Sequence, residues 1–302
     1  MGRVVDVRHL IKRYGDFTAV HDISFSVEDG EIFGILGPNG SGKTTTVESL
    51  QGLRKIDGGS VRVLGLDPLT QAKEIRRLIG SQLQESALPD RVKVWEALDL
   101  FGSISSHGPS VSELLEDWGL PDKRNARFGS LSGGQQQRLF VALALVNGPS
   151  LVFLDEMTTG LDPASRRVVW DLIRRIRERG TTVVLVTHFM EEAETLCDRL
   201  IVVDNGAVVA EGTPAGLIDR YGGGVRVRFT LNGEDDGWLS SVPHVSGWEK
   251  ERNKYEVRGD GPVLAYVASA LVDHGIAPTD LRQERASLED VFLALTSEGS
   301  ET

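Results

Sequence analysis

A glycine-rich segment constrains this chain more than any other feature. It consists of an apolar run, a loop matching G-x-x-x-x-G-K-[ST] and a helix start, which read Phe33-Gly34-Ile35-Leu36, Gly37-Pro38-Asn39-Gly40-Ser41-Gly42-Lys43-Thr44 and Thr45-Thr46-Val47. The loop glycines allow positive φ angles, so backbone N–H groups can wrap around an anion, and the helix start adds the positive end of its dipole. Lys43 would bind the β- and γ-phosphates, and the Thr44 hydroxyl would hold Mg²⁺. The segment predicts a nucleoside-triphosphate site.

The motif leaves alternatives open. A glycine turn with a chance lysine is the bland one, although the flanking strand and helix argue against it. The motif alone does not separate an ATPase from a GTPase or a kinase.

Composition narrows the class of protein. The 302 residues allow one large or two ordinary domains, and 40% hydrophobic with 25% charged residues is typical of a soluble globular protein. Acidic residues outnumber basic ones by 44 to 33, so the net charge of −11 disfavours sequence-independent binding of nucleic acid. The only cysteine, Cys197, excludes an internal disulfide and a thiolate metal cluster.

Sequence features also bear on location. No apolar run approaches the roughly twenty residues that span a bilayer, and the N-terminus lacks the apolar core of a signal peptide. Asp6 stands where a myristoylation motif needs Ser or Thr. We therefore expect a cytoplasmic chain that reaches a membrane only through a partner.

The segments around the loop outline one α/β domain, expected at residues 1–220. Alternating apolar and polar residues over 3–36 predict an antiparallel β layer that leads into the strand carrying the loop. Tyr14 precedes one of these strands and could stack on a base, although a Tyr beside a Gly is more often a turn residue. Helical periodicity further on predicts a helical insert at about residues 88–135.

A second helix start that favours anions follows the insert. The segment Leu131-Ser132-Gly133-Gly134-Gln135 precedes a strong helical pattern and offers Ser132 as N-cap with two glycines beside it. An ordinary cap is the simpler interpretation of this segment taken alone. In a chain that also has a phosphate loop, it suggests that the nucleotide is gripped between two surfaces.

Polar residues follow two buried strands. The run Leu151–Leu154 ends in Asp155 and Glu156, and the run Val183–Thr187 ends at His188. Ligands bind at the carboxyl ends of strands in open α/β sheets, so Asp155 would hold Mg²⁺ and Glu156 would orient and polarise the attacking water. A solvated turn is the alternative for the two acids, and a structural role is the alternative for His188. Their shared sheet edge favours contact of His188 with a γ-phosphate.

The remaining chain predicts a second, smaller domain. Asn205-Gly206 is a hairpin signal that ends the main sheet, and Gly222-Gly223-Gly224 is a candidate linker. Beyond it, residues 225–302 predict a small α+β domain, with strands at 225–229 and 254–257 and helices at 262–273 and 287–295. It contains no catalytic motif, so we expect it to serve in docking.

In combination, these motifs resemble the ATP-binding cassette (ABC) ATPases over roughly residues 3–220. The resemblance implies an α/β P-loop NTPase of the ABC type, with an antiparallel β layer and a helical insert, that binds ATP and Mg²⁺. It also implies a head-to-tail homodimer, in which the Ser132–Gln135 segment of one copy closes on the γ-phosphate held by the other. The roles it assigns are adenine stacking for Tyr14, phosphate proximity for Thr45, coupling of Mg²⁺ to the insert for Gln84, and communication across the dimer for Asp162.

Two further runs, 187–194 and 287–293, look like the ATPase subunits of bacterial multidrug and antibiotic exporters of the daunorubicin-resistance type, which drive a separate membrane permease. Met157 departs from the family pattern, which has Pro after the glutamate, and is expected to leave that turn less rigid. Gln82 is an alternative to Gln84 for the coupling role. The spacing from Gly80 favours Gln84.

Three functions follow from these observations. The first is an export ATPase. The second is a soluble cassette ATPase with a non-transport partner such as the ribosome or DNA, but the chain shows neither a second cassette nor a heptad run. The third is a nucleotide switch that barely hydrolyses, against which Glu156 argues.

Overall fold

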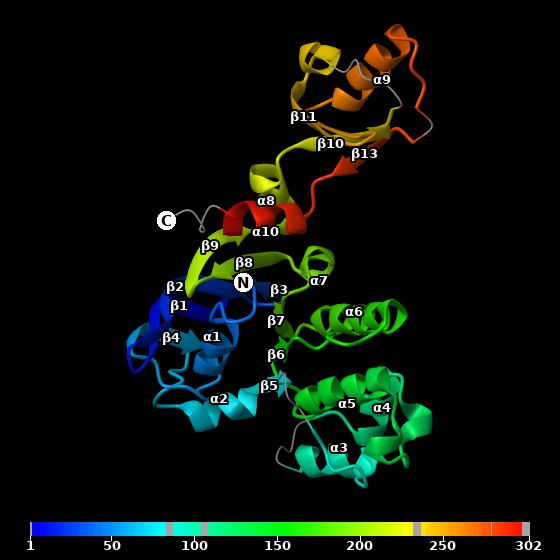
Figure 1. The fold of residues 1–302 in the computed structure, drawn as a ribbon. Coiled ribbons are helices and arrows are strands. Elements are labelled where there is room, and N and C mark those ends of the chain that lie inside the picture. Colours follow the sequence, from blue (N-terminus) through cyan, green and yellow to red (C-terminus); the bar gives the residue numbers. More distant parts are fainter. Residues whose placement is uncertain (1, 83–86, 104–107, 232–236, 279, 298–302) are drawn as a thin grey trace. The chain divides into compact units, whose positions relative to one another are not determined.

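The structure is a computed structural model that describes residues 2–82, 87–103, 108–231, 237–278 and 280–297 (Figure 1). The chain divides into two compact units, Met1–Pro214 and Ala215–Thr302. Each unit has its own sheet and its own hydrophobic core.

The first unit is built on a nine-stranded sheet with the order β4-β1-β2-β9-β8-β3-β7-β6-β5. Its strands are β1 (Arg3–Tyr14), β2 (Phe17–Glu28), β3 (Ile32–Leu36), β4 (Gly58–Val63), β5 (Ile79–Gln82), β6 (Leu151–Asp155), β7 (Thr182–Thr187), β8 (Arg199–Asp204) and β9 (Ala207–Gly212). β3, β6 and β7 are buried at every position, as expected for parallel strands covered on both faces.

The expected antiparallel layer is present. β1 pairs antiparallel with both β2 and β4, and the layer joins the other strands through one parallel pair, Asp22 with Ala207. β3 lies outside this layer, between β8 and β7, and is parallel to both. β8 and β9 form the hairpin predicted from Asn205-Gly206.

Helices pack around this sheet (Figure 1). They are α1 (Lys43–Leu50), α2 (Ala72–Leu78), α3 (Val94–Gly102), α4 (Val111–Asp117), α5 (Gly133–Leu145), α6 (Pro163–Glu178) and α7 (Met190–Leu196), with short 3-10 turns at Pro121–Lys123 and Phe128–Ser130. α3, α4 and α5 form the helical insert. The predicted insert boundary at residue 135 falls inside the first turn of α5, because this helix also packs on the sheet: a Cβ on Gly80 of β5 would lie 2.0 Å from the Ala144 carbonyl oxygen.

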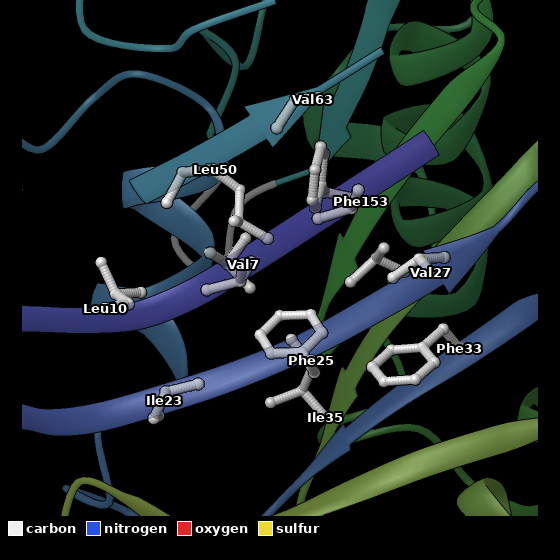
Figure 2. Packing of buried hydrophobic residues seen from close by; sticks show 14 of the residues in the cluster. Val7, Leu10, Ile23, Phe25, Val27, Phe33, Ile35, Leu50, Val63 and Phe153 are labelled. Carbon is white, nitrogen blue, oxygen red and sulfur yellow. The ribbon is translucent and has the colours of Figure 1, made fainter. Parts of the chain in front are cut away.

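One apolar cluster fastens the antiparallel layer to the parallel strands (Figure 2). The rings of Phe25 in β2 and Phe33 in β3 stack with centroids 5.4 Å apart and planes 8° from parallel. Leu50 of α1 and Val63 of β4 belong to the same cluster and are fully buried. Each such side chain contributes about 1.5–3 kcal/mol by leaving water, so this packing fixes the strand that precedes the glycine-rich loop.

The second unit contains an antiparallel sheet of order β11-β12-β10-β13. Its elements are α8 (Pro214–Tyr221), β10 (Val225–Thr230), a 3-10 turn (Gly237–Ser241), β11 (Val245–Glu251), β12 (Lys254–Gly259), α9 (Val263–Asp273), β13 (Arg282–Arg285) and α10 (Leu288–Ser297). Phe229 and Tyr255 stack at 5.4 Å on the apolar face, which shares a core with Val267 of α9. Arg228 and Glu256 pair at 2.6 Å on the opposite face.

The boundary between the units differs from the sequence prediction. It falls after Pro214, whereas the predicted domain ends at residue 220 with a glycine linker at 222–224. Helix α8 belongs to the second unit, and its Leu217 is only 2% exposed. Gly222 is closely packed, because a Cβ there would lie 2.7 Å from the Ala286 Cβ. The glycines therefore end α8 inside the second unit.

Candidate active site

Strand order brings three predicted site segments to one edge of the large sheet. β7 lies between β3 and β6 and runs parallel to both, with Leu36 opposite Thr187 and Asp155 opposite Val186. Because parallel strands end at the same edge of a sheet, the residues that follow these strands lie at one edge. They are the glycine-rich loop after β3, Glu156 after β6 and His188 after β7.

The loop is shaped to receive an anion. Gly40 and Gly42 have φ angles of 83° and 100°, which favour glycine. Gly42 is the N-cap of α1 and makes no side-chain cap, so the first N–H groups of this helix stay available. Lys43 Nζ reaches back across the loop and donates to the carbonyl oxygens of Gly37 and Pro38, at 2.9 and 2.8 Å.

The loop residues divide into two roles. Asn39, Gly40, Gly42, Lys43, Thr44 and Thr45 line a hollow of about 600 Å³. Gly37, Pro38 and Ser41 instead build the loop itself: Ser41 donates its N–H to Pro38 at 3.3 Å and accepts the Gly206 N–H at 3.0 Å.

The other residues lining this hollow are Tyr14, Phe17, Ala19, Glu48, Arg54 and Glu156. Tyr14 is 41% exposed, and Lys12 Nζ and the Arg54 guanidinium lie 5.1 and 6.0 Å from its ring centroid. Arg54 also pairs with Glu48 at 2.7 Å. The sequence analysis missed Phe17, Ala19, Glu48 and Arg54. Only Glu48 had a local signal, because it stands four residues after Thr44 on the same helix face.

Asp155 is the buried acid of the site. Its pKa is raised to about 6, first by burial and then by the negative charge of Glu156, while Lys43 and a hydrogen bond with Thr44 oppose the rise. Oδ1 of Asp155 is buried and has no hydrogen-bond partner. An orphaned carboxylate oxygen beside a hydroxyl fits Mg²⁺, which takes one or two protein oxygens together with phosphate oxygens.

Within the described part of the chain, no group of three or more His, Cys, Asp or Glu side chains could hold a metal ion. Gln84 lies outside the described residues, and Gln82 is buried at the end of β5, with 4% exposure.

Glu156 is held in a strained backbone position. Its φ of 46° is unusual for a residue with a side chain and is typical of functional sites. Its N–H donates to Val186 at 2.9 Å, and its carbonyl accepts the Thr159 N–H at 3.2 Å. Met157 is 1% exposed, so burial and these hydrogen bonds hold the turn. The expectation that Met157 leaves this turn less rigid stays a prediction.

The Glu156 carboxylate lies between two basic groups. Oε1 is 3.1 Å from His188 Nδ1 and 3.9 Å from Lys43 Nζ. The Lys43 side chain is 4% exposed, and burial lowers its pKa while Glu156 and Asp155 oppose the shift. His188 is more open, at 30% exposure, and its ring packs on Phe189 at 4.2 Å. The structure therefore brings together the three predicted catalytic residues.

The Ser132–Gln135 segment forms a second surface. Ser132 is the N-cap of α5: its N–H donates to Gln135 Oε1 at 3.0 Å, and its Oγ accepts the Gln135 N–H at 3.4 Å. The Gln135 side chain, predicted to contact nucleotide, is thus used in a capping box. A Cβ on Gly133 would meet nothing within 4 Å. The segment is not part of the hollow's lining, so it stays open to another molecule.

Asp162 lies beside this surface. It is the N-cap of α6 and accepts the Ser165 hydroxyl at 2.6 Å and the Ser165 N–H at 3.0 Å, and these bonds lower its pKa. A Cβ on Gly134 would lie 3.3 Å from Ser165 Oγ. The starts of α5 and α6 therefore touch, although neither Asp162 nor Ser132 lines the nucleotide hollow.

A triphosphate at this sheet edge would contact an anion-binding loop, a lysine and a carboxylate that can orient a water molecule. These groups together are typical of the active site of a P-loop nucleoside triphosphatase. The sequence pattern of the ABC transporter family matches residues 20–159. Near full-length relatives extend this match, and the chain belongs to the ABC transporter family as an ATP-binding subunit that hydrolyses ATP.

Two groups of relatives are informative. The chain is 38% identical to the daunorubicin resistance ATP-binding protein DrrA2 of Streptomyces coeruleorubidus, over 99% of this chain and 97% of that protein. It is 43% identical to the Nod factor export ATP-binding protein I of Burkholderia pseudomallei, over 97% of this chain and 96% of the relative.

Solved structures agree with the fold. An ATP-binding cassette of an ABC transporter in its ADP conformation matches with a TM-score of 0.64 and 26% identity, over 70% of this chain and 92% of that one. A dimeric cassette in a post-hydrolysis state, bound to ADP and phosphate, matches with a TM-score of 0.63 and 28% identity, over 69% of this chain and 98% of that one. In the part of this chain that the structure describes, no helix combines the length and apolar character needed to cross a membrane.

Proposed function

We propose that two copies of this chain bind two ATP molecules head to tail and that their hydrolysis drives a separate membrane permease that exports a small hydrophobic compound. One observation carries the dimer: the Ser132–Gln135 helix start is open, yet it does not line the hollow of its own chain. A helix N-terminus with free N–H groups favours an anion. A γ-phosphate held by a second copy would supply that anion, and the existence of a dimeric cassette among the similar solved structures supports a dimer.

Each residue of the site has a step in this cycle. The loop N–H groups and Lys43 bind the triphosphate, and Tyr14 stacks on the adenine. Glu156 orients a water molecule so that its oxygen attacks the γ-phosphorus in line, while the bond to the ADP oxygen breaks. The water proton passes toward the Glu156 carboxylate, and His188, 3.1 Å from it, contacts the transferring phosphate.

Thr44 and Asp155 would hold Mg²⁺, which would neutralise charge on the phosphates. The raised pKa of Asp155 is consistent with this role, because a nearby cation would return the carboxyl to its ionised form. Gln84 is the proposed link from this site to the helical insert.

Glu156→Gln tests the hydrolytic part of the proposal. The amide keeps the shape but cannot accept the water proton, so we expect ATP binding to persist and turnover to fall by about 10²-fold or more. Glu191→Gln, an exposed neighbour of the same kind on α7, is the control. Steady-state hydrolysis unchanged by Glu156→Gln would remove this residue from the mechanism.

The same variant tests the dimer. With saturating ATP, Glu156→Gln should accumulate as a dimer in sedimentation experiments, and Gly134→Asp in this background should abolish it by bringing a negative charge to the helix start. A monomer at saturating ATP would contradict the head-to-tail site.

The export role is supported by relatives named for daunorubicin resistance and Nod factor export. We propose that the chain acts on the cytoplasmic face of a membrane, bound to its permease. Co-expression with a candidate polytopic membrane permease should yield a complex whose ATPase activity is lost with Glu156→Gln. Full activity together with binding to ribosomes or DNA would favour the soluble alternative.

A further inference from the structure

Glu192 is a buried acid for which the proposed cycle has no role. It lies on α7, four residues after His188, and is 0% exposed. Its Oε1 accepts a hydrogen bond of 3.0 Å from the Trp170 indole N–H on α6. Its Oε2 is buried and has no hydrogen-bond partner of normal geometry. A buried carboxyl costs several kcal/mol unless its surroundings use it, so its position calls for a reason.

The neighbours of the carboxyl come from the two loops that carry the catalytic residues. Thr187 directly precedes His188, and Thr158 follows Glu156 by two residues; both are 0% exposed. Their hydroxyls interact with Glu192 and lower its pKa, as do Trp170 and the Arg166 charge, but burial outweighs them and the pKa is raised.

Helix α6 holds the same loop from another side. The Arg166 guanidinium lies 4.4 Å from the ring centroid of Phe189, and the His188 ring packs on that ring at 4.2 Å. The Phe189 N–H donates to Thr187 Oγ1 at 3.0 Å. The His188 loop is therefore packed against α6 by the Arg166–Phe189 contact and joined to it through Glu192 and Trp170.

We infer that Glu192 is a positioning residue that holds the loops after β6 and β7 in register, so that Glu156 and His188 keep their 3.1 Å contact. The inference rests on the proposed ATPase site. A role limited to satisfying the Trp170 N–H would need one acceptor oxygen, whereas the carboxyl also faces the two threonines. Because in-line attack tolerates little misplacement, a shift of either loop lowers the chemical step without affecting the glycine-rich loop that binds ATP.

The first experiment compares Glu192→Gln, Glu192→Leu and the exposed control Glu191→Gln. The glutamine keeps an acceptor for Trp170 and a polar group toward the threonines, so its kcat should stay within about 3-fold of the parent. The leucine loses both contacts, so kcat should fall about 10- to 100-fold while KM for ATP changes less than about 3-fold. Equal kcat for Glu192→Leu and the parent protein would overturn the inference.

A second experiment separates positioning from general stability. In a His188→Ala background, Glu192→Leu should lower kcat by clearly less than it does in the parent protein, because one of the two groups that it positions is already gone. A full multiplicative loss in that background would overturn the inference. Where Glu192→Leu fails to fold, Glu192→Gln combined with Trp170→Phe takes its place, with the same expected split between kcat and KM.

The two proposals fail differently. Absence of ATPase activity in the parent protein, with or without its permease, would refute the proposed function and this inference with it. Normal activity in the parent, together with a Glu192→Leu variant whose only change is a lower unfolding temperature, would overturn the positioning role alone.

Discussion

The raised pKa of Asp155 makes a quantitative prediction about stability. The carboxyl has an ordinary pKa of 3.8 and a pKa of about 6 in the folded, nucleotide-free protein. The folded state therefore binds this proton more tightly than the unfolded state does between about pH 4 and 6. By linkage, the free energy of unfolding falls as the pH rises through this range, and the loss is complete above about pH 6.

The magnitude follows from the difference of about two pKa units. At about 1.4 kcal/mol per unit, ionised Asp155 costs the folded protein about 3 kcal/mol at neutral pH. Asp155→Asn removes this cost, so the variant should be about 3 kcal/mol more stable than the parent at pH 7.5. The advantage should shrink toward zero as the pH approaches about 4, because the parent carboxyl is then neutral as well.

Urea unfolding followed by circular dichroism between about pH 4 and 8 measures this difference. Asp162→Asn is a control for which the change in stability with pH has the opposite sign. Hydrogen bonds lower the Asp162 pKa, so this carboxylate stabilises the folded parent protein at neutral pH, and that stabilisation is lost as the pH falls. With Mg²⁺ and ATP, the parent should gain stability, about 2.7 kcal/mol at a hundred times Kd, and Asp155→Asn should gain less. An Asp155→Asn variant that is less stable than the parent at pH 7.5 would refute the reasoning.

Three further changes probe the nucleotide site. Lys43→Ala should weaken ATP binding at least about 10-fold in calorimetry, since it removes the buried charge beside the phosphates; unchanged affinity would contradict the loop assignment. Gly37→Ala should destabilise the protein by several kcal/mol, about 3 or more, because its Cβ would lie 2.2 Å from the Val203 carbonyl oxygen; an unchanged melting temperature would show that the loop can move away. Tyr14→Ala should cost about 1–3 kcal/mol of ATP binding while Tyr14→Phe retains it, and equal affinities for both variants would exclude stacking.

Much of the fold could be predicted because most elements of the first unit have a local signal in the sequence. The run Phe33–Leu36 and the run Leu151–Leu154 are apolar at nearly every position, and both form parallel strands. β11 and β13 were missed, since Val245–Glu251 and Arg282–Arg285 are rich in charged residues. Their charges are tolerated because one face of that sheet pairs arginines with acids, as in Arg228 with Glu284 at 2.7 Å.

The residues of the candidate site also fall into two groups, those that a sequence motif predicts and those that only the packing of the elements brings there. Phosphate binding depends on contiguous backbone N–H groups and one lysine, so a local motif such as Gly37–Thr44 is enough to propose it from the sequence alone. Arg54 and Glu192 carry no motif of their own, and their positions depend on which elements pack beside them.

The sequence by itself determined which segments are proposed to carry the chemistry: a glycine-rich loop that matches the phosphate-binding pattern, a carboxylate pair and a histidine, each after an apolar strand. Only the tertiary structure decided that β7 lies between β3 and β6, which places Glu156 3.1 Å from His188 and 3.9 Å from Lys43. It also decided that Ser132 lies outside its own nucleotide hollow. The physical reason is that strand order and helix packing are set by the burial of apolar faces far apart in the chain, whereas a loop or a cap is set by neighbouring residues.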